Sequence, residues 1–158
     1  MNTAASSPAW RSWAPPILWT LAIVAVSGNL GSPTHTVVVF KWVLSWVITL
    51  DPDTLDQFHF YTRKVLHLMC YGFLAVLWFR ALMASSPDRF WTNSFLALAL
   101  TLLVALSDEG RQYLAADRSS SLWDVGLDMT GGVLFLFLAT CLWVRKNKVP
   151  SGARPPSP

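Results

Sequence analysis

The sequence predicts an all-α, polytopic membrane protein with about four transmembrane helices plus one interfacial or re-entrant helix. Three observations support this fold class: 53% of the 158 residues are hydrophobic, only 13% are charged, and the mean hydropathy is +0.41. Too little polar surface is available to cover a water-soluble globule. The nine tryptophans also suit a bilayer, since the indole ring prefers the headgroup level.

The same composition excludes other classes. The net charge of +3 is small and scattered, and no basic run is interleaved with stacking aromatics, so nucleic acid is not an expected partner. Cys70 and Cys141 both fall inside apolar runs, which does not fit the disulfide framework of a small secreted domain. No H-E-x-x-H or CxxC spacing is present, and neither a metal nor another cofactor is expected.

The first transmembrane helix is predicted from about Ala14 to Leu30, after an N-terminal cytoplasmic segment, residues 1–13. Pro15 and Pro16 are tolerated in its opening turn because those positions have no helical hydrogen-bond partner. The apolar run continues through Ser27 without a small-x-small cleavage site. The sequence therefore predicts an uncleaved first helix.

The next apolar stretch, Val37 to Leu50, is short for a span of roughly 20 residues and carries Lys41 near its middle. An interfacial or re-entrant helix is the preferred interpretation. The alternative is a fifth span, which would reverse the side assigned to everything before it.

Three longer stretches follow. The first runs from about Lys64 to Ala84, with basic residues near its ends that can snorkel. The second spans Phe90 to Ser107, and its helix could continue into the polar sequence beyond. The third runs from about Leu122 to Val144. The transmembrane domain is accordingly predicted as residues 14–146, and the Pro-, Ser- and Gly-rich residues 147–158 as a disordered tail.

The distribution of charge predicts the orientation. With four spans, the termini and the loop holding Arg80 and Arg89 lie on the same side of the membrane. That side holds seven of the twelve Lys and Arg residues, and the other side holds eight of the nine acids. Because short cytoplasmic loops are rich in Lys and Arg, both termini are predicted to be cytoplasmic.

Ionisable residues gather at the outer end of the predicted helices. Each one near the bilayer centre carries a desolvation cost of a few kcal/mol that falls toward the interface, so each invites a functional reason. Arg63, His67 and Tyr71 recur at i, i+4 and i+8 and form one polar stripe. Asp108 and Gln112 share a face of the next helix.

Further acids, Glu109, Asp124 and Asp128, lie at the same predicted end. With Lys64, Arg111 and other bases they would form a mouth that binds a charged headgroup while the surrounding helices accept its lipid tail. Arginine supplies the bidentate contact that phosphate favours. A histidine beside a carboxylate could relay a proton at neutral pH.

Two blocks of the sequence, RKVLHLMCYGFLAVL from Arg63 and DEGRQYLAADRSSSLWDVGLDMTGG from Asp108, resemble the signature blocks of the VanZ-like family. That pattern is roughly an RK-x-x-H-x-x-x-Y helix, a DE-x-x-Q turn, an Arg in a short loop, and an Asp followed by small residues and Gly. The matching positions are Arg63, Lys64, His67, Tyr71, Asp108, Glu109, Gln112, Arg118, Asp124 and Gly132.

The chain departs from the pattern at two positions: members often carry Glu where it has Cys70, and Asn where it has Asp128. The resemblance implies a multi-helix protein of the bacterial inner (cytoplasmic) membrane. The family's namesake is associated with resistance to the glycopeptide antibiotic teicoplanin, and no settled reaction is implied.

The leading hypothesis is recognition or chemical alteration of an amphiphilic envelope molecule, a lipid-linked intermediate or a lipophilic glycopeptide, at the outer leaflet. Whether a reaction is catalysed stays open. The candidate catalytic residues are Glu109, His67 and Asp124. The candidate substrate-binding residues are Arg63, Lys64, Tyr71, Asp108, Arg111, Gln112, Arg118 and Asp128.

Two other function classes remain as alternatives. The same residues could form a buried network that fixes helix packing in a non-catalytic scaffold or binding protein. A small transporter or flippase component is the other class, but the inner halves of the predicted helices are nearly devoid of polar residues.

Individual residues also have plainer interpretations. Asp108 could simply pair with Arg111, and Asp124 could cap its helix or interact with the helix dipole. Gly131 and Gly132 are expected to be close-packing positions that let helices approach.

Overall fold

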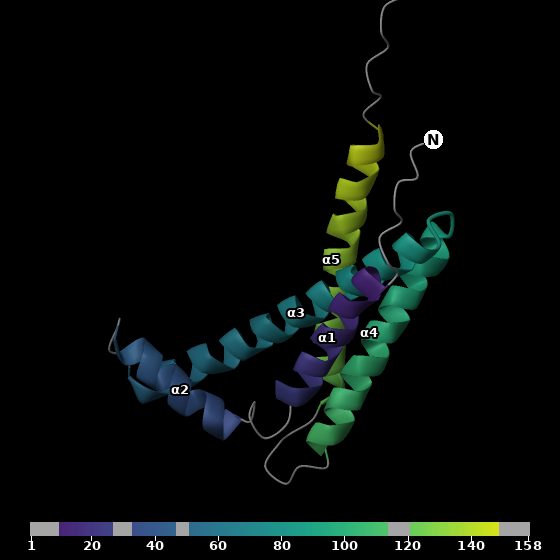
Figure 1. The fold of residues 1–158 in the computed structure, drawn as a ribbon. Helices are drawn as coiled ribbons and strands as arrows, with labels where there is room; N and C mark the ends of the chain where they lie inside the picture. Colours follow the sequence, from purple (N-terminus) through teal and green to yellow (C-terminus); the bar gives the residue numbers. More distant parts are fainter. Residues whose placement is uncertain (1–9, 27–32, 47–50, 114–120, 149–158) are drawn as a thin grey trace, which may run out of the picture.

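The computed structural model describes residues 10–26, 33–46, 51–113 and 121–148, which form five α-helices and contain no strand (Figure 1). The all-helical prediction is confirmed. In chain order the helices are α1 (Trp10–Val26), α2 (Pro33–Ser45), α3 (Pro52–Ser85), α4 (Phe90–Tyr113) and α5 (Leu122–Lys148).

Helix α3 is the longest element and organises the others. Its 34 residues make it about 51 Å long, and it packs more extensively on α5 than on any other helix. The prediction that this helix begins near Lys64 was wrong by twelve residues. Asp51 caps the helix by accepting a hydrogen bond from the Thr54 backbone N–H at 2.9 Å, with Pro52 in the first turn. That hydrogen bond lowers the pKa of Asp51 below its usual value.

The other boundaries differ less from those predicted. Helix α1 begins at Trp10, four residues early, and is described as far as Val26. Helix α4 continues to Tyr113 through the polar sequence, as predicted. Helix α5 reaches Lys148, so it includes the first residues of the predicted tail, and residues 149–158 lie outside the described part of the chain.

Helix α2 lies at the N-terminal end of α3, away from the other helices (Figure 1), and among the described helices it packs on α3 alone. Lys41 forms an ion pair with Asp56 at 3.0 Å, and the Phe40 ring packs against His59. With 13 residues, α2 is about 20 Å long, shorter than a hydrocarbon core of about 30 Å. This length favours the interfacial or re-entrant interpretation over a fifth span.

Three helices, α3, α4 and α5, are long and apolar enough to cross a membrane. The 17 residues of α1 are at the lower limit for a span. Small residues fill the contacts between helices, since Ala75, Ala97 and Ala105 are fully buried, whereas large apolar side chains such as Trp91 and Phe95 are exposed. This inside-out distribution is typical of helices that face lipid.

The crossing of α3 and α5 depends on glycine. A Cβ atom on Gly131 would lie 2.1 Å from the Leu68 carbonyl oxygen, and one on Gly72 would lie 2.6 Å from the Phe135 ring. Close packing was predicted for Gly131 and Gly132 of α5. It holds strictly at Gly131. At Gly132 a Cβ would meet its neighbours only at ordinary contact distances of 3.6–3.7 Å.

We predict that Gly131→Ala destabilises the protein by about 1–3 kcal/mol or more, because backbone atoms of α3 must move to admit the methyl group. Gly126→Ala is the matched control, since it lies on the same helix with open space around it and should stabilise the helix by about 0.5–1 kcal/mol. Thermal unfolding in detergent measures both. Equal melting temperatures for the two variants would contradict the described crossing.

Candidate functional site

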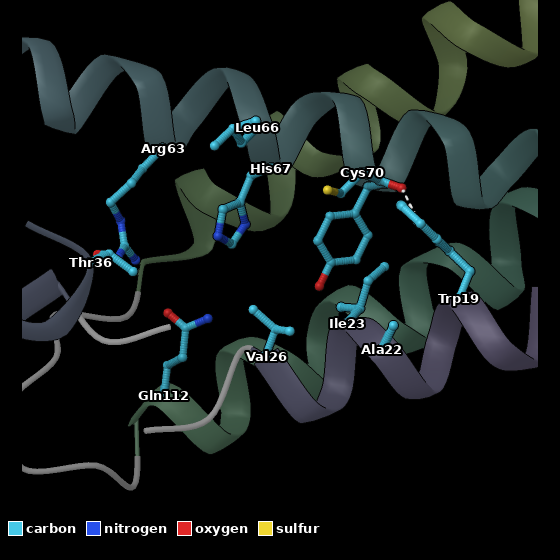
Figure 2. Close-up of a pocket in the computed structure, with 11 residues that line it drawn as sticks. Trp19, Ala22, Ile23, Val26, Thr36, Arg63, Leu66, His67, Cys70 and Gln112 are labelled. Atoms are coloured by element: carbon cyan, nitrogen blue, oxygen red, sulfur yellow. Dashed lines mark hydrogen bonds between the residues drawn. The ribbon is translucent and has the colours of Figure 1, made fainter. Parts of the chain in front are cut away.

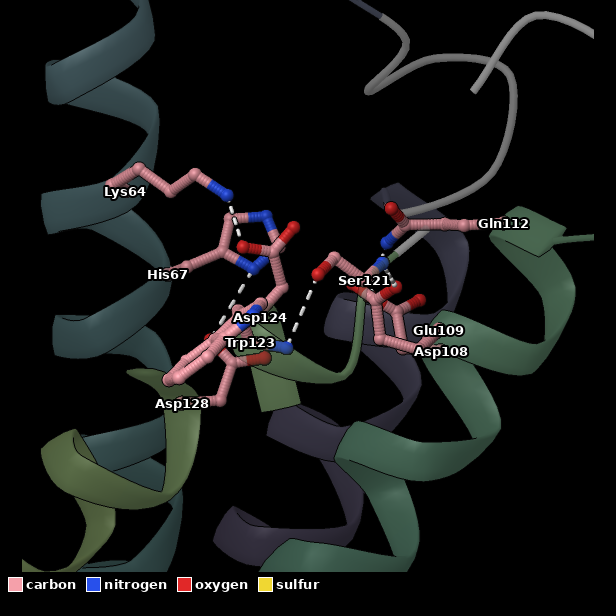
Figure 3. A network of polar contacts seen from close by, with 9 residues as sticks. All are labelled: Lys64, His67, Asp108, Glu109, Gln112, Ser121, Trp123, Asp124 and Asp128. Atoms are coloured by element: carbon pink, nitrogen blue, oxygen red, sulfur yellow. Dashed lines mark hydrogen bonds and ion pairs between the residues drawn. The ribbon is translucent and has the colours of Figure 1, made fainter. Parts of the chain in front are cut away.

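Side chains from three helices meet where α4 ends and α5 begins (Figure 3). We call this group the polar cluster. Its members are Lys64 and His67 on α3, Asp108, Glu109 and Gln112 on α4, and Ser121, Asp124 and Asp128 at the start of α5. The sequence predicted this gathering from the spacing within each helix together with the four-span topology, and these side chains lie close together in the structure.

Within the polar cluster, two contacts between ionisable side chains join α3 to α5. Lys64 Nζ pairs with Asp124 Oδ1, with both side chains less than one-third exposed. His67 Nδ1 lies 3.4 Å from Asp128 Oδ1, and the Asp128 side chain is only 2% exposed. The contact gives the buried Asp128 side chain a partner on another helix.

Ser121, rather than Asp124, caps α5. The Ser121 hydroxyl accepts a hydrogen bond from the Trp123 backbone N–H at 3.2 Å, the contact expected of an N-cap residue. Of the two plainer interpretations of Asp124, the cap was therefore wrong, whereas an interaction with the helix dipole agrees with its position in the first turn of α5. The Asp124 carboxylate is instead directed toward Lys64.

Helix α4 holds its carboxylates by local hydrogen bonds. Asp108 accepts from Gln112 Nε2 at 2.9 Å and from Arg111 Nη2 at 3.0 Å, so both predicted pairings within this helix are confirmed. The same Arg111 nitrogen donates to the Val24 carbonyl oxygen at 2.8 Å. Arg111 thereby ties the end of α1 to the polar cluster.

Glu109 has a different environment. It is 7% exposed, and its Oε2 accepts a hydrogen bond from the Ser121 backbone N–H at 3.2 Å. Among the described residues, no Lys, Arg or His lies within ion-pair distance of this carboxylate. A nearly buried carboxyl group at the end of a membrane helix invites a functional explanation.

Tyr71 lies one turn beyond His67, with the two rings stacked at 6.1 Å between centroids. The side chain is 1% exposed, and its hydroxyl has no hydrogen-bond partner among the described residues. Such an orphaned polar atom is uncommon in a buried site.

A cavity of about 300 Å³ lies against the polar cluster (Figure 2). Helices α1 and α3 form its long walls, and Thr36 of α2 and Gln112 of α4 close one end. We call it the amphipathic pocket, because polar side chains gather at the Thr36 end whereas Trp19 of α1 lies at the other. His67 and Gln112 belong to both the pocket and the polar cluster.

Arg63 brings a positive charge to this pocket. Its Nη1 donates to the Thr36 hydroxyl at 2.9 Å, and His59 Nε2 lies 3.2 Å from the same oxygen. No carboxylate is among the described residues that line the pocket. Asp108 and Asp128 instead contact two of the lining residues, Gln112 and His67.

The predicted site residues fall into two groups. Arg63, His67, Tyr71 and Gln112 line the pocket. The others form contacts within the polar cluster or beside it, namely Lys64, Asp108, Glu109, Arg111, Asp124 and Asp128. Arg118 lies outside the described residues.

Sequence reasoning missed Trp19 and Thr36. Trp19 lies in an apolar stretch and Thr36 just before one, so nothing in their local sequence marks them as pocket residues. Only the packing of α1 and α2 on α3 brings them to the pocket.

Comparison with known proteins gives one match. The model of a protein family described as VanZ/LLP1 matches residues 7–144, most of the chain. No match was found among curated proteins or solved structures.

We predict that Lys64 and Asp124 are coupled in stability. Lys64→Met and Asp124→Asn each leave a partly buried charge without its partner, whereas the double variant removes both charges. A double-mutant cycle in thermal or denaturant unfolding should give a coupling free energy of about 1–3 kcal/mol. Strictly additive effects would mean that the pair does not hold α3 against α5.

Proposed function

The chain belongs to the VanZ/LLP1 family, and from this membership together with the geometry of the polar cluster we propose that it binds, and chemically alters, an amphiphilic cell-envelope molecule. The site would face the outer leaflet of the bacterial cytoplasmic membrane, with both termini in the cytoplasm. A lipid-linked intermediate or a lipophilic glycopeptide fits this description, and a contribution to glycopeptide resistance follows from the second.

One observation carries the proposal: a pocket with apolar walls ends against a cluster of ionisable groups, and His67 lies at the junction. An amphiphile has the same division between tail and head. Ligand pockets combine apolar walls with a few convergent polar groups, and ionisable residues inside membrane helices are functional candidates because they are costly to keep.

The proposed chemistry is proton transfer at the head of the ligand. Asp128 holds Nδ1 of His67, which orients the imidazole as a carboxylate does in many catalytic sites. His67 would then exchange a proton with the bound molecule, and Glu109 would act as the second acid or base. Asp124 and Lys64 neutralise each other, so we assign them to positioning the helices.

A scaffold role is the competing proposal, and a specific observation favours it. Two pairs satisfy their charges or hydrogen bonds within the protein, as a purely structural network would. These pairs are Lys64 with Asp124 and Gln112 with Asp108. The scaffold reading assigns no task to the pocket beside the network.

We predict that His67→Asn and Glu109→Gln abolish the activity but leave the folded protein abundant. If these residues transfer protons, the yield of altered product should fall by roughly 100-fold or more. Comparative lipidomics of cells with wild-type protein, each variant or no protein is the measurement, and teicoplanin susceptibility of the same cells is a second readout.

Asp88→Asn is the matched control, because it removes an exposed acid between α3 and α4, at the opposite end of α4 from the polar cluster. It should behave as wild type. If His67→Asn and Glu109→Gln both fail to accumulate, the residues are structural and the catalytic proposal is wrong. If both accumulate and the lipid profile still matches wild type, they take no part in the activity.

A further inference from the structure

We infer that the amphipathic pocket takes a single linear alkyl or acyl chain that carries an anionic headgroup, with the chain between α1 and α3 and the head beside Arg63. This inference rests on the proposed function and names the chemical class of ligand that the same site would bind.

The two ends of the pocket differ in polarity. At one end lie Arg63, Thr36 and Gln112, with their polar groups turned inward (Figure 2). At the other end Ala22 and Trp19 of α1 provide apolar walls. A ligand that is polar at one end and apolar along its length matches this order, whereas a compact polar molecule would leave the apolar walls unfilled.

The charge around the pocket favours an anion. Among the described residues that line it, Arg63 carries the one permanent charge, and its guanidinium suits the planar oxygens of a carboxylate or phosphate. Arg63 already has partners, among them the Thr36 hydroxyl, and its five N–H donors allow it to bind an anion as well. Asp108 and Asp128 contact the lining residues Gln112 and His67 but are not themselves among the described residues that line the pocket.

The size of the pocket favours one chain. Its volume of about 300 Å³ lies at the lower end of the range for ligand pockets. This size favours one alkyl chain over the two chains of a diacyl lipid.

Trp19 forms the apolar end of the pocket and is held in place. Its Nε1 donates to the Cys70 carbonyl oxygen at 3.1 Å, and its ring packs edge-on against Phe73 at 5.0 Å between centroids. In a bilayer the lipid tails are as apolar as the pocket, so fit rather than hydrophobicity selects the chain. Trp19 would therefore set the longest chain that binds well.

A native thiol can report occupancy. Cys70 lines the pocket, and Cys141 is exposed on α5. In full-length Cys141→Ser protein in lipid nanodiscs, the alkylation rate of Cys70 by N-ethylmaleimide measures access to the pocket. In Cys70→Ser protein, alkylation of Cys141 controls for effects of each amphiphile on the bilayer.

The first arm varies the head at a constant ten-carbon chain. Decyl phosphate and decanoate should slow alkylation of Cys70, with neutral decyl glucoside about ten-fold weaker because it lacks the charge-assisted hydrogen bonds. Decyltrimethylammonium should be inactive. Arg63→Gln should abolish the preference for anions, and Arg80→Gln, on an exposed face of α3, should retain it.

The second arm varies chain length with a phosphate head. Protection should pass through an optimum chain length in the Cys141→Ser protein. Trp19→Leu should shift the optimum to longer chains by about two to four carbons, since it frees roughly two to four water-sized volumes. Trp13→Leu removes another tryptophan of α1 that packs on α3, at Trp78, and should leave the optimum unchanged.

Equal protection by anionic, neutral and cationic heads, or no dependence on chain length, would overturn the inference while leaving an amphiphile-binding site in place. Absence of protection by every amphiphile would overturn the pocket as the binding site. The proposed function is tested separately by the His67 and Glu109 variants in cells, so the two can fail independently. Dialkyl phosphate that protects as well as the single-chain compound would overturn the single-chain claim.

Discussion

Four carboxylates of the described residues lie near one end of a bundle of apolar helices, and the free energy of keeping them from water constrains the rest of the structure. A charge in this setting costs several kcal/mol unless a partner is supplied. The partners of two of these acids come from another helix: Lys64 faces Asp124, and His67 faces Asp128. Each pair therefore also holds α3 against α5, and the close approach at Gly131 makes both contacts geometrically possible.

The same pairing divides the site into two compartments. The acids are held on the side of α4 and α5, and the imidazole of His67 lies at the boundary with the pocket. The pocket itself keeps Arg63 and apolar walls. Structural and functional roles of the polar cluster are thus not exclusive, because the network that fixes the helices also determines which charge a ligand would meet.

The two departures from the VanZ-like pattern both lie near this boundary. Members of the family often have Asn where this chain has Asp128, whose Oδ1 lies 3.4 Å from Nδ1 of His67. Members often have Glu where this chain has Cys70, which lines the pocket. A carboxylate at that position would place a negative charge in the pocket, whereas the thiol leaves its described lining without an acid.

Hydropathy and spacing along the chain determined the helical membrane fold, the approximate spans and the stripes of polar residues, because helix periodicity alone places i and i+4 on one face. They did not determine that α3 begins at Pro52, after its Asp51 cap, since a polar segment is helical or not according to its cap and its packing on α2. Nor did they reveal Trp19 and Thr36 as pocket residues. Which acid meets which base, and which apolar residue closes a cavity, depends on contacts between helices distant in sequence, and only tertiary packing decides those.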